Sequence, residues 1–170
     1  HLEKSWPDDT PVRVLLWRAI DTQKYATEMD AMMQDGGALK ILVANTEAFS
    51  SARIEKTIRH FSKAHKKKLV VIDEASRIKE RTSLRTKRIL NLFHDYSYRD
   101  ILTGSPVLNT PEDLWAPCLL LSPTALGPAV GRNFYAFRAR YSELKLESIW
   151  VKGPRGPVQR SFKTVVGYRN

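Results

Sequence analysis

A run of apolar residues that ends in two carboxylates, at residues 69–74, constrains the fold of this chain more than any other stretch. Leu69 to Ile72 are apolar and rich in β-branched side chains, and Asp73 and Glu74 follow directly. Such a short run suits a strand buried on both faces, in a central position of a parallel sheet. Open α/β sheets bind their ligands at the carboxyl ends of the strands, so the acid pair lies where a ligand is expected.

The pair of carboxylates needs a positive partner, because two adjacent charged acids are costly to remove from water. A phosphate-bound Mg²⁺ would supply that charge, with one carboxylate in the metal shell and the other orienting a water molecule. Apolar residues followed by Asp-Glu are also common as a polar strand end with a helix cap. The pattern alone therefore leaves a nucleotide site and a simple strand end as alternatives.

Strand and helix signals alternate along the chain. The predicted strands are residues 12–17, 40–44, 69–73 and 98–103, and the helices between them have capping residues at Asp21 or Thr22, at Ser50 or Ser51, and at Ser83. Three strand–helix–strand crossovers in a row predict an α/β fold, a parallel sheet flanked by helices. Strand-like runs at residues 148–151 and 161–166, on either side of a turn at residues 153–157, add a C-terminal β-hairpin.

The size of the chain and its charge set the broad class. Its 170 residues allow one domain, with a core over residues 11–122 and an accessory helix and hairpin over 123–170. There are 28 Lys and Arg against 18 Asp and Glu, a net charge of +10, which favours nucleic acid as a partner. No apolar stretch approaches the roughly 20 residues of a membrane span, so no membrane partner is expected.

The one cysteine, Cys118, excludes an internal disulfide and is expected to pack rather than react. A reducing compartment suits such a chain. We therefore expect an intracellular protein, located in the cytoplasm of a bacterial or phage-infected cell, or in the nucleus of a eukaryote.

Five short motifs occur in a fixed order. They are ILVANTEAF at residues 41–49, DEASRIK at 73–79, LTGSPVLN at 102–109, PEDLW at 111–115 and VVGYRN at 165–170. Together they resemble the Swi/Snf family of superfamily II helicase-like ATPases, which carry DEAHRLKN, LTGTPLQN and a following helix with ELW. The resemblance covers most of the chain and is far more specific than any one motif.

The resemblance implies a RecA-like (P-loop NTPase) lobe whose chemistry is ATP hydrolysis coupled to movement along double-stranded DNA. Asp73 would hold Mg²⁺, through water, and Glu74 would orient or deprotonate the attacking water. The residues implied in coupling nucleotide state to movement are Ser76, Thr103, Gly104 and Ser105. The residues implied in contacting DNA are Thr46, Glu47, Arg77, Lys79 and Asn109.

Two positions depart from the family pattern. Ser76 stands where the family has His, and Glu80 stands where it has Asn. Ser76 can still donate a hydrogen bond, but the link between the nucleotide and coupling motifs would be weaker. Glu80 adds a charge that is unfavourable to DNA.

No phosphate-binding loop of the form G-x-x-x-x-G-K-[ST] occurs in the 170 residues. The resemblance therefore implies a RecA-like lobe that lacks its first strands. These strands and a second RecA-like lobe would come from the same protein. Neither ATP nor Mg²⁺ would be fully bound by this segment alone, so we expect the isolated chain to be inactive. We also expect it to expose a sheet edge and an apolar face.

Two other functions fit parts of the pattern. A non-catalytic basic module, derived from such a motor, would hold nucleic acid or a partner protein without turnover. A metal-dependent nuclease would use Asp73 and Glu74 with a further acid, for which Asp100 is the nearest candidate. The aromatic and basic residues 133–141 would either stack bases or form a packing helix, and both their helical spacing and the resemblance favour the packing helix.

Overall fold

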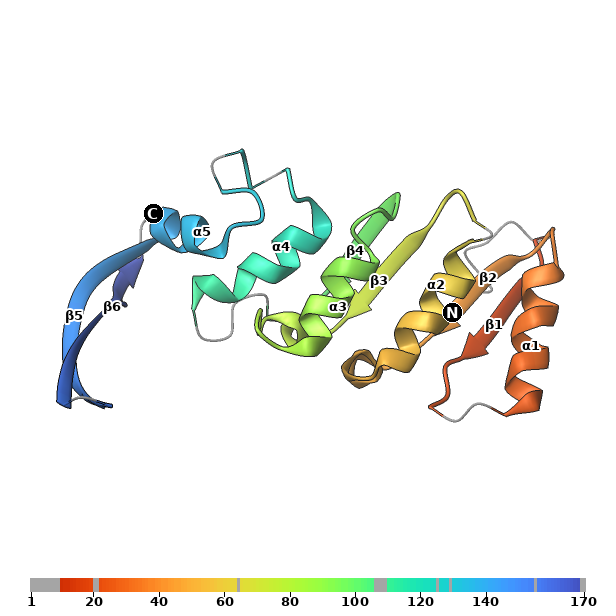
Figure 1. Ribbon diagram of the computed structural model, residues 1–170. Helices are drawn as coiled ribbons and strands as arrows, with labels where there is room; N and C mark the ends of the chain where they lie inside the picture. The colour runs from red at the N-terminus through yellow and green to blue at the C-terminus, as the bar shows by residue number, and fades with distance from the viewer. Residues whose placement is uncertain are drawn as a thin grey trace. The chain divides into compact units, whose positions relative to one another are not determined.

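The computed structural model describes residues 10–19, 22–63, 65–105, 110–124, 126–128, 130–154 and 156–168. Strands and helices alternate over most of this chain, and an antiparallel hairpin follows (Figure 1). The chain divides into two compact units. The first comprises the described residues up to Val71 together with Thr82–Asp100. The second comprises Ile72–Arg81 and the described residues from Ile101 onward.

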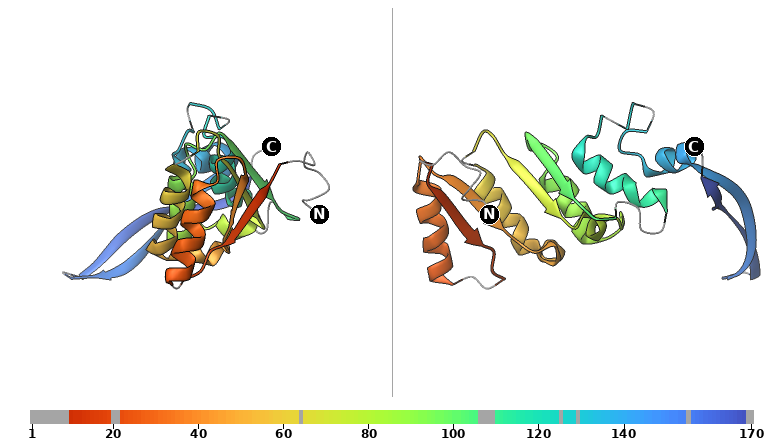
Figure 2. Two further views of the ribbon diagram at one scale, coloured as in Figure 1. Left: turned by 90° about the vertical axis from the view of Figure 1, so that its right-hand side faces the viewer. Right: turned by 180° about the vertical axis from the view of Figure 1, so that it is seen from behind.

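The first unit begins with a parallel pair of strands and the helix that connects them. Strand β1 (Val12–Leu16) pairs with β2 (Leu39–Val43), and helix α1 (Gln23–Gln34) lies beside the pair (Figures 1 and 2). The side-chain oxygen of Thr22 accepts from the Tyr25 backbone at 3.2 Å, so the predicted cap is confirmed. The helix buries an apolar face that comprises Tyr25, Met29 and Met32, packed with Leu15 of β1.

A second group of elements completes this unit: the 3₁₀ turn η2 (Thr46–Ser50), helix α2 (Ala52–Lys63) and helix α3 (Leu84–Leu92). Ile54 of α2 and Ile89 of α3 are completely buried. The rings of Phe49 and Phe93 pack edge to face with centroids 5.7 Å apart. These contacts hold η2, which follows β2, against the side of α3.

Strands β3 (Leu69–Asp73) and β4 (Tyr98–Leu102) form a second two-stranded sheet. The Tyr98 backbone N–H donates to the Lys68 carbonyl at 3.0 Å. Because this hydrogen bond joins the starts of the two strands, they run parallel. Strand pairs in the described part of the chain are β1–β2, β3–β4 and β5–β6. The α/β class, with parallel strands that alternate with helices, is thus confirmed.

Each parallel pair is covered on one face only. On β3, Val70 and Ile72 are buried, whereas Leu69 and Val71 are 56% and 48% exposed. The prediction that this strand is buried on both faces is therefore wrong, because the helices in this chain pack on one side of it. The expected exposed apolar surface is confirmed, and β1 has one as well, where the alternate residues Val12, Val14 and Leu16 are exposed.

The second unit contains the turn η3 (Ala75–Ile78), the turn η4 (Pro111–Leu114) and two helices, α4 (Trp115–Leu121) and α5 (Phe134–Tyr141). Its core is apolar and includes Ala75, Ile78, Ala116, Leu119, Leu120 and Phe137. The rings of Trp115 and Phe134 lie 5.6 Å apart and join α4 to α5, so α5 has a packing role. No helix in the described part of the chain is both long enough and apolar enough to cross a membrane.

Cys118 is half-buried in α4. Burial raises the pKa of its thiol, so the thiol stays protonated near neutral pH and is a poor nucleophile. This placement agrees with the prediction that Cys118 packs rather than reacts.

The predicted hairpin is present and is longer than the sequence pattern indicated. Strand β5 (Ser142–Gly153) and strand β6 (Gly156–Tyr168) are antiparallel over almost their whole length. One irregularity, between Glu143 and Leu144, shifts the register near the base. Gly156 has a φ of 119°, a backbone conformation that favours glycine and allows the tight turn.

Candidate functional site

The acidic pair lies at the carboxyl end of β3. Asp73 is the last residue of that strand and Glu74 follows it, and both side chains are exposed. Glu74 has φ 55° and ψ 66°, a left-handed conformation that is uncommon for a residue with a Cβ atom. This backbone turn ends the strand abruptly and leads into η3. It places the Glu74 carboxylate beside the end of the neighbouring strand.

Two hydroxyl groups donate to the Glu74 carboxylate. The Ser76 Oγ lies 2.7 Å from Oε1 of Glu74, and the Thr103 Oγ1 lies 3.3 Å from the same oxygen. The Ser105 backbone N–H in turn donates to the Thr103 hydroxyl at 3.3 Å. The structure thus brings together the DEAS and TGS motifs, which are almost thirty positions apart. Gly104, between Thr103 and Ser105, is exposed with open space around its Cα.

The acid pair fits Mg²⁺ only if further ligands come from elsewhere. No group of three or more His, Cys, Asp or Glu side chains in the described residues is arranged to hold a metal ion. Magnesium, however, is commonly bound by one or two carboxylates together with water and substrate phosphates. Two exposed carboxylates at a strand end match that mode of binding. Of the two, Asp73 would be the more available ligand, because Oε1 of Glu74 already accepts two hydrogen bonds.

A small cavity adjoins the hydrogen-bonded group. Its volume is about 20 Å³, and its walls include Ala75, Ser76, Thr103, Leu114 and Pro117. That volume holds one water molecule, so it is no nucleotide pocket.

The cations that follow the acid pair have different surroundings. Arg77 is exposed in η3. The Lys79 ammonium lies 3.8 Å from the Asp113 carboxylate, which also accepts from the Thr110 backbone at the start of η4. Lys79 therefore has a structural partner in addition to its predicted role at DNA. Asn109, the remaining predicted DNA contact of this region, lies outside the described residues.

Arg81 is held by aromatic rings of α5. Its guanidinium lies 4.1 Å from the centroid of Phe134 and 5.4 Å from that of Tyr135. Cation–π contacts of this kind fix the guanidinium plane. The segment after η3 is therefore tied to the packing helix of the second unit.

The other two predicted DNA residues, Thr46 and Glu47, lie in the first unit. They begin η2, which is separated from β2 by two residues, and Asn45 caps this turn by accepting from the Ala48 backbone at 2.9 Å. The Glu47 carboxylate lies 3.3 Å from Arg85 of α3. This ion pair reduces the negative charge that Glu47 would present to a phosphate backbone.

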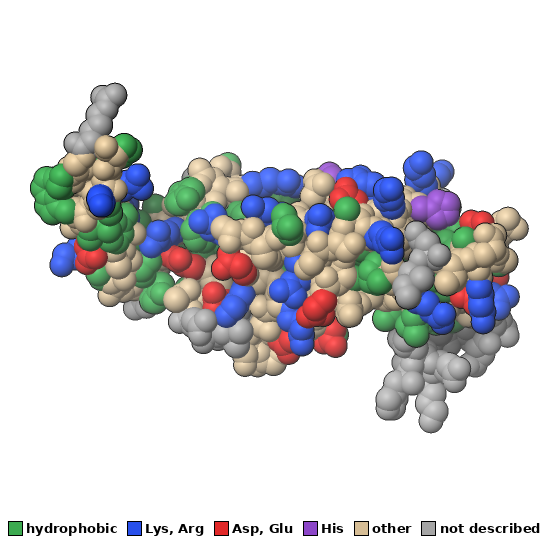
Figure 3. Space-filling view, turned by 60° about the horizontal axis from the view of Figure 1, so that its bottom comes forward, with side chains coloured by type: hydrophobic (Ala, Val, Ile, Leu, Met, Phe, Trp, Pro, Cys, Tyr) green, Lys and Arg blue, Asp and Glu red, His purple; other side chains and the backbone are tan. Residues whose placement is uncertain are grey.

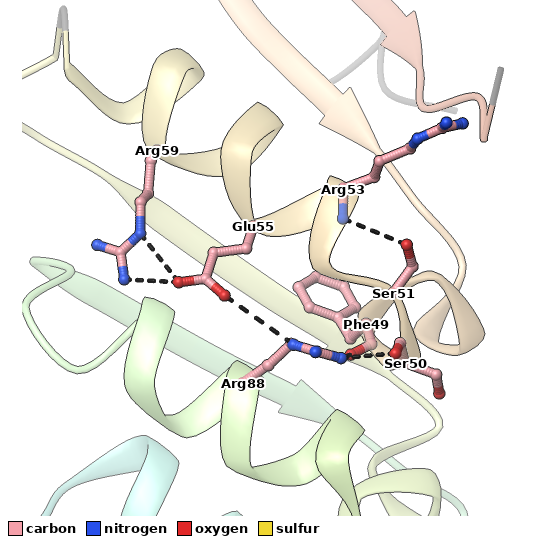
Figure 4. Close-up of polar contacts among 7 residues, drawn as sticks. All are labelled: Phe49, Ser50, Ser51, Arg53, Glu55, Arg59 and Arg88. Carbon is pink, nitrogen blue, oxygen red and sulfur yellow. Dashed lines mark hydrogen bonds and ion pairs between the residues drawn. The ribbon is translucent and has the colours of Figure 1, made fainter. Parts of the chain in front are cut away.

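Arg88 of α3 anchors the end of the same turn (Figure 4). One of its terminal nitrogens donates to two successive carbonyl oxygens, those of Phe49 at 3.0 Å and Ser50 at 2.6 Å. Its Nε also lies 3.9 Å from Glu55 of α2, which bonds Arg59 at 2.9 Å. A charged group thus satisfies backbone acceptors that the end of the turn leaves unpaired.

Sequence reasoning missed the roles of Arg85 and Arg88. Their partners lie 38 and 39 positions away, so the sequence carries no local signal for these contacts. Both are better described as positioning residues for η2. They hold the segment that carries Thr46 and Glu47.

We expect Arg88→Met to destabilise the chain by about 1.5–3 kcal/mol, the usual net contribution of hydrogen bonds to a charged group. Methionine retains the length of the side chain but leaves the carbonyls of Phe49 and Ser50 unpaired. Urea unfolding measures the change. The matched control is Arg59→Met, which removes only an exposed pair worth less than about 1 kcal/mol. Equal losses in the two variants would contradict the anchoring role.

Two comparisons with known proteins bear on this site. A protein-family model described as the SNF2-related domain matches residues 8–142. A relative from Arabidopsis thaliana, the ISWI chromatin-remodeling complex ATPase CHR17, is 39% identical over 83 residues. That alignment covers 48% of this chain and 7% of the relative, so the similarity spans a small part of a much longer protein.

Proposed function

The chain belongs to the SNF2-related domain family, whose members are Mg-ATP-dependent hydrolases, and from this premise we propose that it is part of a DNA-dependent ATPase and DNA translocase. In this proposal the 170 residues are a single domain, part of the first RecA-like lobe. The core spans residues 11–122, and residues 123–170 are an accessory helix and hairpin. The partners are ATP, double-stranded DNA and the rest of the same protein.

One observation carries the proposal: the Glu74 carboxylate accepts from both Ser76 and Thr103. A strand end with a helix cap would need no link between these segments. A motor needs one, because the state of the nucleotide at one strand end must reach the segment that contacts DNA. Ser76, in place of the family's His, still makes the contact to Glu74.

The chemistry assigned to this chain's own residues is positioning. Glu74 orients the attacking water and accepts its proton, and Thr103 and Ser76 hold the carboxylate at the strand end. Asp73 is the residue that would hold Mg²⁺, which supplies charge neutralisation on the phosphates when bound. Gly104 and Ser105 complete the turn, and the Ser105 N–H keeps the Thr103 hydroxyl oriented.

The DNA-binding part of the proposal draws on Thr46, Glu47, Arg77, Lys79 and Asn109. The net charge of +10 supports a polyanionic partner for these segments. A protein that acts on DNA would be located in the nucleus of a eukaryote, or in the cytoplasm of a bacterial or phage-infected cell. The alternative, a basic module that binds nucleic acid or protein without turnover, rests on the same charge and requires no hydrolysis.

ATP hydrolysis separates these two functions. We expect the full-length protein to release phosphate from ATP, and to do so faster with duplex DNA than without it. The isolated 170-residue chain should release none under the same conditions, because it has no phosphate-binding loop. A full-length protein that binds duplex DNA and never hydrolyses ATP would instead support the binding module. Turnover by the isolated chain that disappears in Glu74→Gln would contradict the expectation for the segment.

A further inference from the structure

The hairpin β5–β6 is a two-stranded ribbon whose long strands are paired only with each other in the described chain. Its base is held by the rest of the second unit. Arg138 donates to the Lys163 carbonyl at 3.2 Å, and the Glu112 carboxylate accepts from Arg138 at 3.0 Å and from Ser142 at 3.2 Å. Beyond this base, large side chains on both faces are exposed. An isolated ribbon of this kind is marginally stable in water, so a partner surface is expected.

The strand register separates the side chains of the ribbon into two different faces. Directly opposed residues share a face, as do residues two apart on one strand. One face, named here the Trp150 face, comprises Leu146, Ser148, Trp150, Lys152, Pro157, Gln159, Ser161 and Lys163. The opposite face is mainly apolar and comprises Ile149, Val151, Val158 and Phe162, with Glu147 and Arg160.

The Trp150 face is basic, and its lysines and polar side chains lie among the exposed apolar side chains of Leu146 and Trp150. Its charged side chains are Lys152 and Lys163, and it carries no carboxylate from residue 146 to residue 163. Figure 3 shows Lys and Arg side chains next to hydrophobic ones on the hairpin, at the left of the view. Trp150 is 70% exposed, the most exposed of the large apolar side chains in the described chain. Hydroxyls of Ser148 and Ser161 bond each other at 2.8 Å between the cations.

Acidic residues are confined to the base of the ribbon. Glu143 lies at the irregularity beside α5, and Glu147 is on the opposite face, where Thr164 donates to it at 3.1 Å. The sequence from residue 148 to residue 161 contains Lys152, Arg155 and Arg160 and no Asp or Glu. Arg155 lies outside the described residues. Every charged residue in the outer part of the hairpin is thus positive.

We propose that the Trp150 face is a binding surface for duplex DNA. The inference rests on the proposed function and adds a contact region that none of the sequence motifs includes. Lysines neutralise phosphates, while serine hydroxyls and the Gln159 amide are the side chains that bond phosphate and sugar oxygens. A two-stranded ribbon fits the major groove of B-DNA, and strands of this length reach about 40 Å, more than one turn of the duplex.

The composition of this face distinguishes DNA from a protein partner. The cores of protein interfaces are depleted in lysine, whereas surfaces that bind nucleic acid are enriched in cations with aromatic side chains among them. Trp150 between two lysines, with no acid nearby, has the second composition. The opposite face of the ribbon is mainly apolar, which is the composition of a protein interface core.

The test measures binding of the full-length protein to a fluorescein-labelled 30-base-pair duplex by anisotropy over a range of salt concentrations. We expect Lys152→Glu/Lys163→Glu to weaken binding about tenfold or more and to lower the salt slope by about 2, one for each lost phosphate contact. Trp150→Ala should also weaken binding. Lys152→Arg/Lys163→Arg keeps the charges and should bind like the wild type, which shows that the two positions tolerate substitution.

Lys24→Glu/Lys56→Glu is the matched control, since it makes the same change in net charge on exposed helix positions. If it weakens binding as much as the hairpin variant does, the inference is overturned. If the wild type hydrolyses ATP and binds the duplex while the hairpin variants bind equally well, the hairpin inference fails and the proposed function stands. A wild type that neither hydrolyses ATP nor binds the duplex would defeat both. Self-association lost in Trp150→Ala, with unchanged DNA affinity, would identify a protein partner and overturn the inference.

Discussion

Replacing Glu74 with Gln in the full-length protein should lower kcat for ATP hydrolysis by about 10²–10⁴-fold, the usual contribution of a general base. The amide oxygen of Gln still accepts hydrogen bonds from Ser76 and Thr103, which now hold the Glu74 carboxylate at 2.7 and 3.3 Å. The local geometry should therefore persist while the acceptor for the proton is lost. Steady-state phosphate release with saturating ATP and duplex DNA measures the effect.

The matched control for this change is Glu28→Gln. Glu28 forms only a surface pair with Lys24 on α1, at 4.0 Å, so its loss should leave hydrolysis unchanged. Affinity of Glu74→Gln for duplex DNA should also be unchanged, because Glu74 is not assigned to the DNA-contacting set. Hydrolysis at the wild-type rate in Glu74→Gln would remove the assignment of the general base.

Asp73→Ala should abolish ATP hydrolysis by a different route. Asp73 is the exposed carboxylate at the end of β3 and the residue assigned to the metal. Asp73 would hold the Mg²⁺ that neutralises the phosphates. Loss of this metal ligand costs several kcal/mol of transition-state stabilisation, which corresponds to a fall in rate of at least about 100-fold. We expect DNA affinity to remain largely intact. Phosphate release measured over a series of Mg²⁺ concentrations checks the assignment.

Asp100→Ala is the control, because Asp100 is an exposed aspartate on β4, the strand paired with β3. It should retain full ATPase activity. The same pair of variants tests the nuclease alternative: cleavage of plasmid DNA that depends on both Asp73 and Asp100 would favour that chemistry. Unchanged ATP hydrolysis in Asp73→Ala would show that the metal is held elsewhere.

Local signals predicted most of the secondary structure. Thr22 and Ser83 each cap a helix by accepting from a backbone N–H three residues on, a contact that depends only on neighbours in the sequence. The strand at Leu69–Asp73 was also predicted at its observed bounds. These elements depend on local propensity and on the spacing of apolar residues, which are both present in the sequence.

Burial could not be predicted in the same way. The apolar run at the start of β3 indicates a strand with two covered faces, but Leu69 and Val71 are exposed. An apolar side chain in the sequence indicates that one face of the strand is suited to burial. It does not indicate which segment of the protein covers that face. The length of the hairpin was underestimated for a related reason, since Leu146 and Lys163 pair across the ribbon without a hydrophobic alternation that marks a buried face.

The candidate site also has one part that the sequence predicted and one part that it did not. The family resemblance implied a link between the acid pair and the coupling motif, and the structure places oxygens of Glu74 and Thr103 3.3 Å apart. The roles assigned to Asp73, Glu74 and Thr103 remain predictions. The contacts of Arg88 were not predictable, because they join a side chain on one helix to carbonyl oxygens of a distant turn.

The left-handed backbone at position 74 has a consequence for how this chain responds to selection. With φ at 55°, a residue bearing a Cβ atom loses about 1 kcal/mol or more relative to glycine. A library screened for heat resistance alone would therefore accumulate glycine or asparagine at position 74, and if Glu74 has the proposed role these variants would lack ATPase activity. Because the proposal assigns the general base to Glu74, selection for a more thermostable variant would have to demand ATP hydrolysis in every round.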